Sequence, residues 1–176
     1  MKTIKIIMFL SLMLVVNVQI SYGQTYNEEE TNAETIKNNE ELKKSFFANL
    51  GIGTNVNPIN SQISGNTLFL TQIGEYNTAS IITETNASEI NINQNGDVNT
   101  VDINYVVNTA IANLTQNGDN NRISDFVRDR NADISLDLTQ NGDGLIFVRK
   151  GVNSLTKSLK FRQTEASPIL IIKSYY

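Results

Sequence analysis

The sequence predicts an all-β protein, specifically a β-solenoid of about five strand–turn–strand repeats preceded by a flexible polar leader. Three observations support this prediction. A glutamine recurs after 22, 22, 24 and 23 residues, a strand-like segment precedes each glutamine, and a glycine turn follows all but the last. A fixed period of this size is typical of stacked supersecondary units. The glutamines are Gln72, Gln94, Gln116, Gln140 and Gln163.

Residues 1–23 have the features of a secretory signal peptide. Lys2 and Lys5 precede an apolar run that extends from position 6 to position 16, and the small residues Ser21 and Gly23 stand before Gln24. This run of 11 residues is shorter than the roughly 20 that a transmembrane helix needs. We therefore predict cleavage near Gly23 and a secreted, extracellular protein.

Residues 24–65 are predicted to form a polar leader and a capping segment. Residues 24–44 are polar and acidic, a composition typical of a flexible linker or a short, marginal helix. A short apolar run and then a loop rich in Gly, Asn and Pro follow. Because the terminal repeats of a solenoid need a cap, we expect this run to cover the first repeat. The run comprises Phe46, Phe47, Leu50 and Ile52.

Residues 66–176 contain the five repeats, in which positions are counted from the glutamine as position zero. Positions −4 and −2 are apolar, whereas positions −3 and −1 are mostly polar. This period of two predicts a strand with one buried face. A second strand is expected from about +6 to +11, with an apolar residue at +7. The predicted core stripe comprises Leu68, Leu70, Ile90, Ile92, Leu114, Leu136, Leu138, Leu159 and Phe161.

A turn is predicted between the two strands of each repeat. Gly at +2, an acidic residue at +3 and Asn at +5 recur, and Gly and Asn suit a turn with positive φ angles. We interpret the acidic row as turn chemistry whose charge repulsion slows premature assembly, with a calcium ladder as the alternative. The turn residues are Gly74, Gly96, Gly118, Gly142, Asn77, Asn99 and Asn121. The acidic row comprises Glu75, Asp97, Asp119 and Asp143.

Two architectures can use such repeats. In a hairpin meander the two strands of one repeat pair with each other, which an Asn-Gly turn favours. In a β-solenoid the strands face each other across a thin core and pair with the next repeat, about 4.8 Å along the axis. The solenoid explains why like residues recur at like positions, because it stacks glutamine on glutamine and leucine on leucine. We therefore predict the solenoid.

The phrase Gln-x-Gly-x-x-Asn-x-Ala, preceded by two alternating apolar residues, resembles the curlin repeat. Curlins are the secreted subunits of curli, the extracellular amyloid fibres of bacterial biofilms. The first repeat matches in full, and the next two differ only at the alanine position. The fourth repeat lacks the asparagine and the fifth keeps only Gln163, so the match covers roughly residues 66–176. The residues of the complete match are Gln72, Gly74, Asn77 and Ala79.

The chain also departs from the curlin pattern. The family's serine six residues before the glutamine is present only as Ser88, and its second glutamine, eleven residues after the first, is absent throughout. The resemblance therefore does not extend to equally fast self-assembly. The degenerate, basic fifth repeat resembles that of the minor, nucleating curlin subunit, where such a repeat is associated with holding the nucleator at the cell surface. By this resemblance, the corresponding residues are Lys157, Lys160, Arg162, Gln163 and Lys173.

The composition argues against several function classes. Without Lys2 and Lys5, 12 basic residues stand against 18 acidic ones, a net charge of −6, whereas nucleic-acid binding needs a clustered basic surface. The chain has no histidine and no cysteine, which excludes His-based catalytic triads and disulfides and argues against zinc. We expect no enzyme activity, no cofactor, no metal, no small-molecule substrate and no nucleic-acid partner.

Position +9 is unusual because it holds Asp125 and Arg149 in adjacent repeats, where Ile81 and Ile103 occupy it in the first two. If buried, the two charged residues could pair and fix the register, although a buried pair seldom adds net stability. The alternative is a bulge in the second strand that turns both side chains to solvent. We favour the bulge.

Two functions remain as hypotheses. The open edge of a solenoid can template another chain, so the favoured prediction is a self-assembling subunit of curli-like fibres. It would be a minor or nucleating component that supports cell adhesion and the biofilm matrix. Its expected partners are further copies or a second curlin-like subunit, with an outer-membrane secretion pore as another candidate. The alternative is a monomeric β-solenoid adhesin that binds surface or matrix carbohydrate, but the aromatic residues do not recur at one repeat position.

Overall fold

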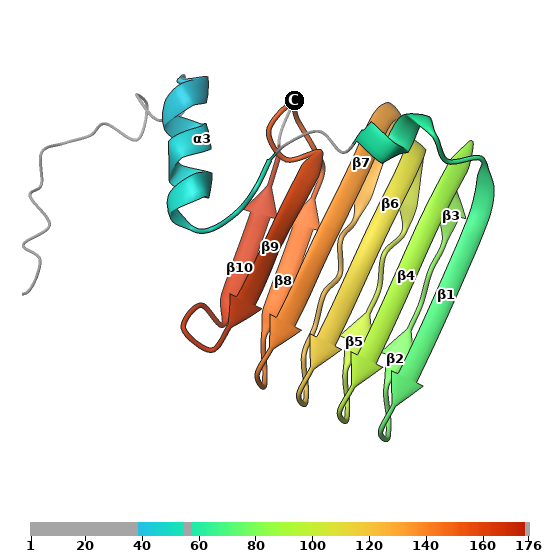
Figure 1. Ribbon diagram of the computed structural model, residues 1–176, viewed down its shortest axis with the longest axis vertical. Coiled ribbons are helices and arrows are strands. Elements are labelled where there is room, and N and C mark those ends of the chain that lie inside the picture. Colours follow the sequence, from blue (N-terminus) through green and yellow to red (C-terminus); the bar gives the residue numbers. More distant parts are fainter. Residues whose placement is uncertain (1–38, 55–57, 175–176) are drawn as a thin grey trace, which may run out of the picture. The chain divides into compact units, whose positions relative to one another are not determined.

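The computed structural model describes residues 39–54 and 58–174, which fold as a β-solenoid of about five turns (Figure 1). The predicted signal peptide and most of the leader lie outside the described residues. No helix in the part of the chain that the structure describes is long and apolar enough to cross a membrane. The elements are α3 (Glu40–Asn49), η1 (Pro58–Ser61), β1 (Gly65–Ile73), β2 (Thr78–Ala79), β3 (Thr83–Glu84), β4 (Ala87–Asn95), β5 (Thr100–Val101), β6 (Tyr105–Asn117), β7 (Val127–Asn141), β8 (Ile146–Lys150), β9 (Ser158–Thr164) and β10 (Ile169–Lys173).

Each turn of the solenoid, called a rung below, carries one of the five glutamines, so rung one contains Gln72 and rung five contains Gln163. The strands that contain the glutamines form one parallel sheet in the order β1-β4-β6-β7-β9 (Figure 1). The pairs β2–β5 and β8–β10 are also parallel, and Arg122 bridges Thr100 and Ile146 between them. Repeats thus pair with the next repeat, which is the predicted solenoid and excludes the meander.

The stacking keeps equivalent residues in register. Gln72 pairs with Gln94, and the same holds for every later pair of glutamines, even where the spacing is 24 residues. The extra residues are absorbed at a corner, where Val107 pairs with Asp129 but Thr109 pairs with Asp133. A slip of one residue would turn each apolar side chain to the other face, so the insertion is confined to the corner and the buried stripes continue unbroken.

The core lies between the two walls of the solenoid. The predicted stripe is buried from Ile90 to Phe161, together with residues of the second wall such as Ile103 and Phe147. The prediction is wrong for the first rung, where Leu68 and Leu70 remain 51% and 45% exposed. They lie on the apolar face, in register with buried Ile90 and Ile92, but among the described strands rung one has a neighbour on one side only.

The apolar run before the repeats covers the last rung, and our expectation that it covers the first was wrong. Helix α3 starts at Asn39, whose side chain accepts hydrogen bonds from two backbone amides of the first turn, and it buries none of its residues. After it, Ile52 is buried in the core and Gly53 forms an antiparallel bridge with Lys160 of β9. The two bridge hydrogen bonds measure 2.8 and 2.9 Å. We call residues 47–53 the cap segment.

The cap segment covers the last rung because the chain after it runs back along the solenoid to the first rung. Helix η1 contacts β6 and β7, near the middle of the solenoid. Asn60, which is buried there, donates hydrogen bonds to the carbonyl oxygen of Ile134 (2.9 Å) and the hydroxyl of Thr109 (3.1 Å). The chain therefore passes along the solenoid from the last rung back to the first, where β1 begins at Gly65.

Candidate functional site

The five glutamines form one continuous hydrogen-bonded ladder along the solenoid. The side-chain amide of each glutamine except Gln163 donates from Nε2 to Oε1 of the glutamine in the following rung, at 2.7, 2.9, 2.9 and 2.9 Å. Gln94, Gln116, Gln140 and Gln163 are buried, whereas Gln72 is exposed. Every donor in this ladder points toward the C-terminal end, so the ladder has a direction.

Interrupting the ladder in its middle should destabilise the protein. Gln116→Leu leaves Oε1 of Gln140 without its donor and removes one acceptor of Gln94, both in the core. We expect a loss of about 1–3 kcal/mol in the free energy of unfolding, measured by denaturant titration. Gln72→Leu is the matched control, since it removes one bond at an exposed end. A cost for Gln116→Leu no larger than that for Gln72→Leu would contradict a ladder that stabilises the core.

The asparagines at +5 join one rung to the next. Nδ2 of Asn77 donates to the carbonyl of Gly96 (2.7 Å), while its Oδ1 accepts from the amide of Asn99 (2.9 Å). Asn99 and Asn121 repeat both bonds one rung further on. Our explanation by positive φ is therefore wrong for these asparagines. The positive φ angles lie one residue earlier, at Tyr76, Val98, Asn120 and Gly144.

The glycines at +2 are required by two features at once. Their φ angles lie between +110° and +129°, which residues with a side chain rarely adopt. A Cβ atom on Gly74 would also lie 2.2 Å from the carbonyl oxygen of Gly96, and Gly96 meets Gly118 in the same way. The turn of each rung can stack on the turn of the next only because position +2 has no side chain.

The acidic row at +3 provides hydrogen-bond acceptors for backbone amides. Oδ1 of Asp97 accepts from the amide of Glu75 at 2.7 Å, and Asp119 and Asp143 do the same for the rungs before them at 2.8 Å. Among the described residues, no three acidic side chains converge as metal ligands would. The hydrogen bonds account for the row without calcium, so they favour the turn-chemistry interpretation.

Rung one presents an open edge, which we call the rung-one edge and define as β1 and β2. All nine residues of β1 are exposed, including the apolar Leu68, Phe69, Leu70 and Ile73. β1 ends the sheet order, so its outer backbone groups pair with no described strand. Oε1 of Gln72 and the carboxylate of Glu75 accept no hydrogen bond from the described residues. The edge combines unpaired backbone, apolar side chains and free acceptors.

The opposite end of the solenoid is closed. The cap segment pairs with β9 through Gly53, and Nε2 of Gln163 donates to the carbonyls of Ile146, Ser167 and Pro168 at 2.9–3.0 Å. Of the basic residues on rung five, Lys160 pairs with Asp137 at 2.7 Å, and this hydrogen bond and charge raise the pKa of Lys160. Arg162 and Lys173 are exposed, and Lys157 is half-buried. The two ends are therefore unlike.

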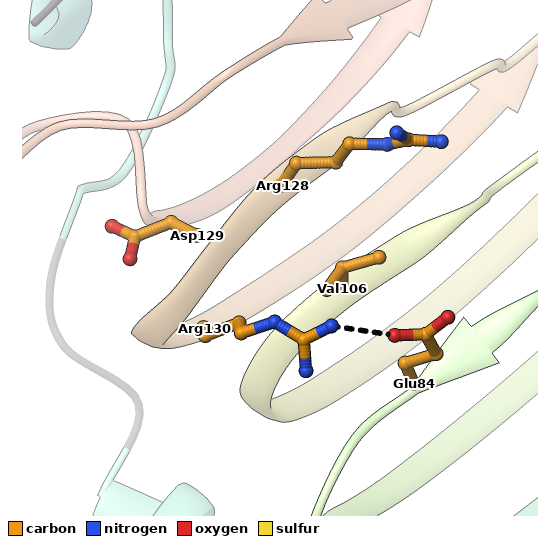
Figure 2. A pocket seen from close by; sticks show the side chains of 5 residues that line it. All are labelled: Glu84, Val106, Arg128, Asp129 and Arg130. Atoms are coloured by element: carbon orange, nitrogen blue, oxygen red, sulfur yellow. Dashed lines mark hydrogen bonds and ion pairs between the residues drawn. The ribbon is translucent and has the colours of Figure 1, made fainter.

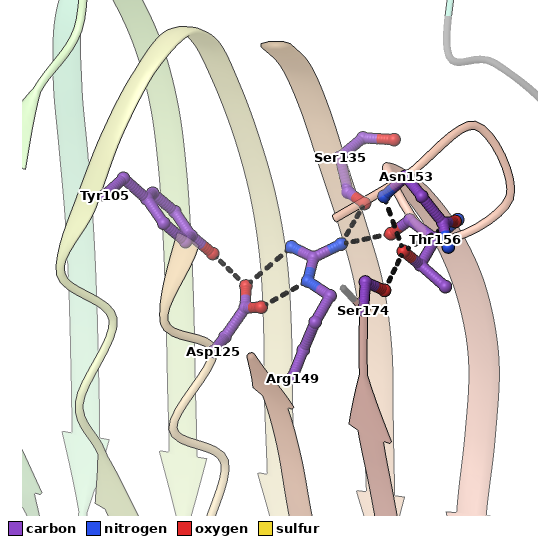
Figure 3. A network of polar contacts seen from close by, with 7 residues as sticks. All are labelled: Tyr105, Asp125, Ser135, Arg149, Asn153, Thr156 and Ser174. Atoms are coloured by element: carbon purple, nitrogen blue, oxygen red, sulfur yellow. Dashed lines mark hydrogen bonds and ion pairs between the residues drawn. The ribbon is translucent and has the colours of Figure 1, made fainter. Parts of the chain in front are cut away.

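Asp125 and Arg149 are buried and paired, so the bulge that we favoured is wrong (Figure 3). Both side chains have no exposed surface. Nε and Nη2 of Arg149 donate to the two carboxylate oxygens of Asp125, at 2.5 and 2.9 Å. Nη1 donates to the carbonyl of Thr156 at 2.9 Å, and the hydroxyl of Tyr105 donates to Asp125. The network joins residues of rungs two, three and four to the loop before rung five.

This network is internally satisfied. No described buried side-chain nitrogen or oxygen lacks a hydrogen-bond partner. Burial, together with the charge of Asp125, raises the pKa of Tyr105 well above its usual value, so its hydroxyl stays protonated as a donor. Burial alone would lower the pKa of Arg149, but the neighbouring Asp125 outweighs it and raises that pKa. Arg149 therefore stays charged, and the network serves as a structural element in the core.

The described part of the surface has several shallow, open depressions. One is lined by charged side chains of stacked rungs, in which Arg130 pairs with Glu84 at 2.9 Å beside Arg128 and Asp129 (Figure 2). Both members of this pair are more than half exposed. Within the described repeats, exposed aromatic rings lie at Phe69 and Tyr76 of rung one and at Phe126 of rung three, at different repeat positions. They form no row on which a sugar chain could stack.

No protein-family model, no curated protein and no solved structure matches the chain in the three comparisons with known proteins.

Proposed function

We propose that the mature chain is a secreted subunit of curli-like extracellular fibres, and that it seeds growth by pairing another chain along the rung-one edge. The observation that carries this proposal is the open strand β1, whose nine residues are all exposed. Soluble proteins usually cover such an edge or interrupt it with charges, prolines or bulges. Between Gly65 and Ile73 there is neither a charge nor a proline.

The unlike ends support a minor, nucleating component rather than the bulk subunit. A bulk subunit must pair through both ends, whereas rung five is already paired with Gly53. A nucleator needs one templating edge and an attachment to the cell. Secretion is supported by the signal peptide features of residues 1–23, and attachment by the exposed basic residues of rung five.

A blocked edge should abolish fibre seeding. Leu70→Lys places a charge in the apolar stripe of β1, where an added rung would bury it without a partner. Thr71→Lys is the matched control, because it adds the same charge on the outward face of the same strand. Added in small amount to a fibre-forming curlin subunit diluted from denaturant, the unchanged mature chain and Thr71→Lys should shorten the lag before thioflavin T fluorescence reports detergent-resistant fibres, whereas Leu70→Lys should not.

Other outcomes of this experiment are equally informative. If Leu70→Lys shortens the lag as much as the unchanged chain does, seeding does not use the rung-one edge. If the unchanged chain stays a soluble monomer, accelerates no second fibre-forming chain and unfolds in one cooperative transition, the fibre proposal fails. The carbohydrate-binding adhesin would then be the better hypothesis.

A further inference from the structure

We propose that the partner at the rung-one edge is a different protein chain, whose last rung carries Gln at 0, Gly at +2 and Asn at +5. The last rung of a second copy of this chain does not fit there. This inference rests on the proposed function and specifies the partner that it requires. The argument comes from the direction of the ladders that join neighbouring rungs.

We call the rung on the N-terminal side of a junction the upper rung. An incoming rung would lie above rung one and pair with it in the same way that rung one pairs with rung two. At the junction with rung two, Nε2 of Gln72 donates to Oε1 of Gln94. The side chain of Asn77 donates to the carbonyl of Gly96 and accepts from the amide of Asn99. The lower rung contributes only its own glutamine oxygen and backbone groups to these contacts. In these contacts, the residue requirements therefore fall on the upper rung.

The first requirement is a glycine at +2 in the incoming rung. At every junction among rungs one to four, a Cβ at this position would lie 2.2–2.4 Å from the carbonyl oxygen of the next glycine. At the rung-one edge that carbonyl belongs to Gly74. A partner with a side chain at +2 could not bring its turn onto the turn of rung one.

The second requirement is an asparagine at +5. The carbonyl of Gly74 and the amide of Asn77 take part in no hydrogen bond with the described residues, whereas the equivalent groups of rungs two and three are bonded by the asparagine above them. Only a side chain with both a donor and an acceptor satisfies the pair, which is the pattern of an amide.

The free acceptors of rung one point to an additional rung. The acidic residue at +3 serves the rung above it, because its carboxylate accepts the amide of that rung's own +3 residue. Rung one keeps this acceptor as Glu75, although the described chain has no rung above it. The open oxygen of Gln72 is likewise placed to accept from an incoming glutamine. Both are acceptors, so the partner must present donors.

The chain's own fifth rung fails these requirements. It has Glu165 at +2 and Pro168 at +5, so it would bring a side chain against Gly74 and no side-chain amide to Asn77. Its edge is also paired with Gly53 of the cap segment. Among the described rungs, only rung five has the cap segment and not another rung below it, which explains why it could lose the glycine and the asparagine.

The test uses fluorescently labelled peptides and the mature protein, with binding followed by anisotropy at concentrations where each peptide alone is monomeric. The first probe is the peptide of residues 87–103, a complete repeat with Gln94, Gly96 and Asn99. The second is the same peptide with Gly96→Glu and Asn99→Pro, which imitates rung five. The third is the peptide of residues 156–172, rung five itself. The matched control is the first peptide with Asn93→Arg, which copies rung five only on the outward face.

We expect the complete peptide and its Asn93→Arg control to bind equally. The other two should bind at least about tenfold more weakly, because they lose two hydrogen bonds and meet a steric clash. The Leu70→Lys protein should lose binding of the complete peptide, and the Thr71→Lys protein should keep it.

Three results would overturn the inference, namely no binding of the complete peptide, equal binding of the rung-five peptide, or binding that survives Leu70→Lys. If the rung-five peptide binds equally while Leu70→Lys still abolishes seeding, the proposed function stands and the partner is a second copy. If the mature chain neither forms nor seeds fibres, the proposed function fails whatever the peptides do.

Discussion

Asp125→Leu is expected to lower the free energy of unfolding by about 3–5 kcal/mol, the usual cost of removing one partner of a buried ion pair. The substitution leaves the guanidinium of Arg149 charged in the core, where only the carbonyls of Thr156 and, at 3.4 Å, Ser135 remain as acceptors. It also removes the acceptor of the Tyr105 hydroxyl. Denaturant titration of the monomeric protein, followed by far-UV circular dichroism, measures the change.

The double variant Asp125→Leu with Arg149→Met is the control. It replaces both charges by apolar side chains of similar size, so it should recover most of the lost stability or exceed the unchanged protein. An Asp125→Leu protein as stable as the unchanged one would contradict the buried pair. A double variant as unstable as the single one would instead mean that Asp125 acts mainly through Tyr105.

Gly96→Ala is expected to cost about 3 kcal/mol or more. The added Cβ would lie 2.2 Å from the carbonyl oxygen of Gly118 and 2.8 Å from the carboxylate of Asp119. The φ angle of +126° is itself unfavourable for alanine. Rungs two and three would have to separate at the turn, which also strains the nearby hydrogen bond from Asn99 to Gly118.

The control variant Gly144→Ala tests the effect of a positive φ angle without a steric clash. Gly144 has a φ of +66° and nothing within 4 Å of an added Cβ, so alanine there should cost only about 1–2 kcal/mol. Thermal unfolding of the two variants side by side checks the difference. Equal destabilisation would mean that the conformation, and not the close stacking of turns, makes glycine necessary at +2.

The solenoid and its register could be predicted from the sequence because both depend on repetition. The glutamines recur every 22–24 residues. If like residues stack, this spacing is the length of one turn of a solenoid. The alternation of apolar and polar residues before Gln94 or Gln116 likewise identifies the buried face without reference to the rest of the chain. The glutamine spacing and the apolar–polar alternation both predict the same register in several repeats, so each strengthens the prediction made from the other.

The features that could not be predicted depend on single, non-repeated contacts. Nothing local distinguishes a segment that covers rung one from one that covers rung five, because Ile52 is far in sequence from the strand it meets. The burial of Asp125 and Arg149 was missed because each charge alone argues for solvent, and only their pairing permits the core. The role of Asn77 was misassigned because the sequence shows a turn but not the rung stacked against it.

The antiparallel bridge between Gly53 and Lys160 also bears on the order in which the protein folds. Neighbouring rungs contact each other over about one repeat, whereas this bridge joins residues separated by most of the repeat block. Because the entropy cost of closing a loop rises with its length, the bridge should form after the rungs that it encloses. A partly folded molecule therefore passes through a stage in which the outer edge of β9 is also unpaired, while its other edge is paired with β7. At this stage backbone groups are open at both ends, and closure of the bridge then leaves the rung-one edge as the one open end.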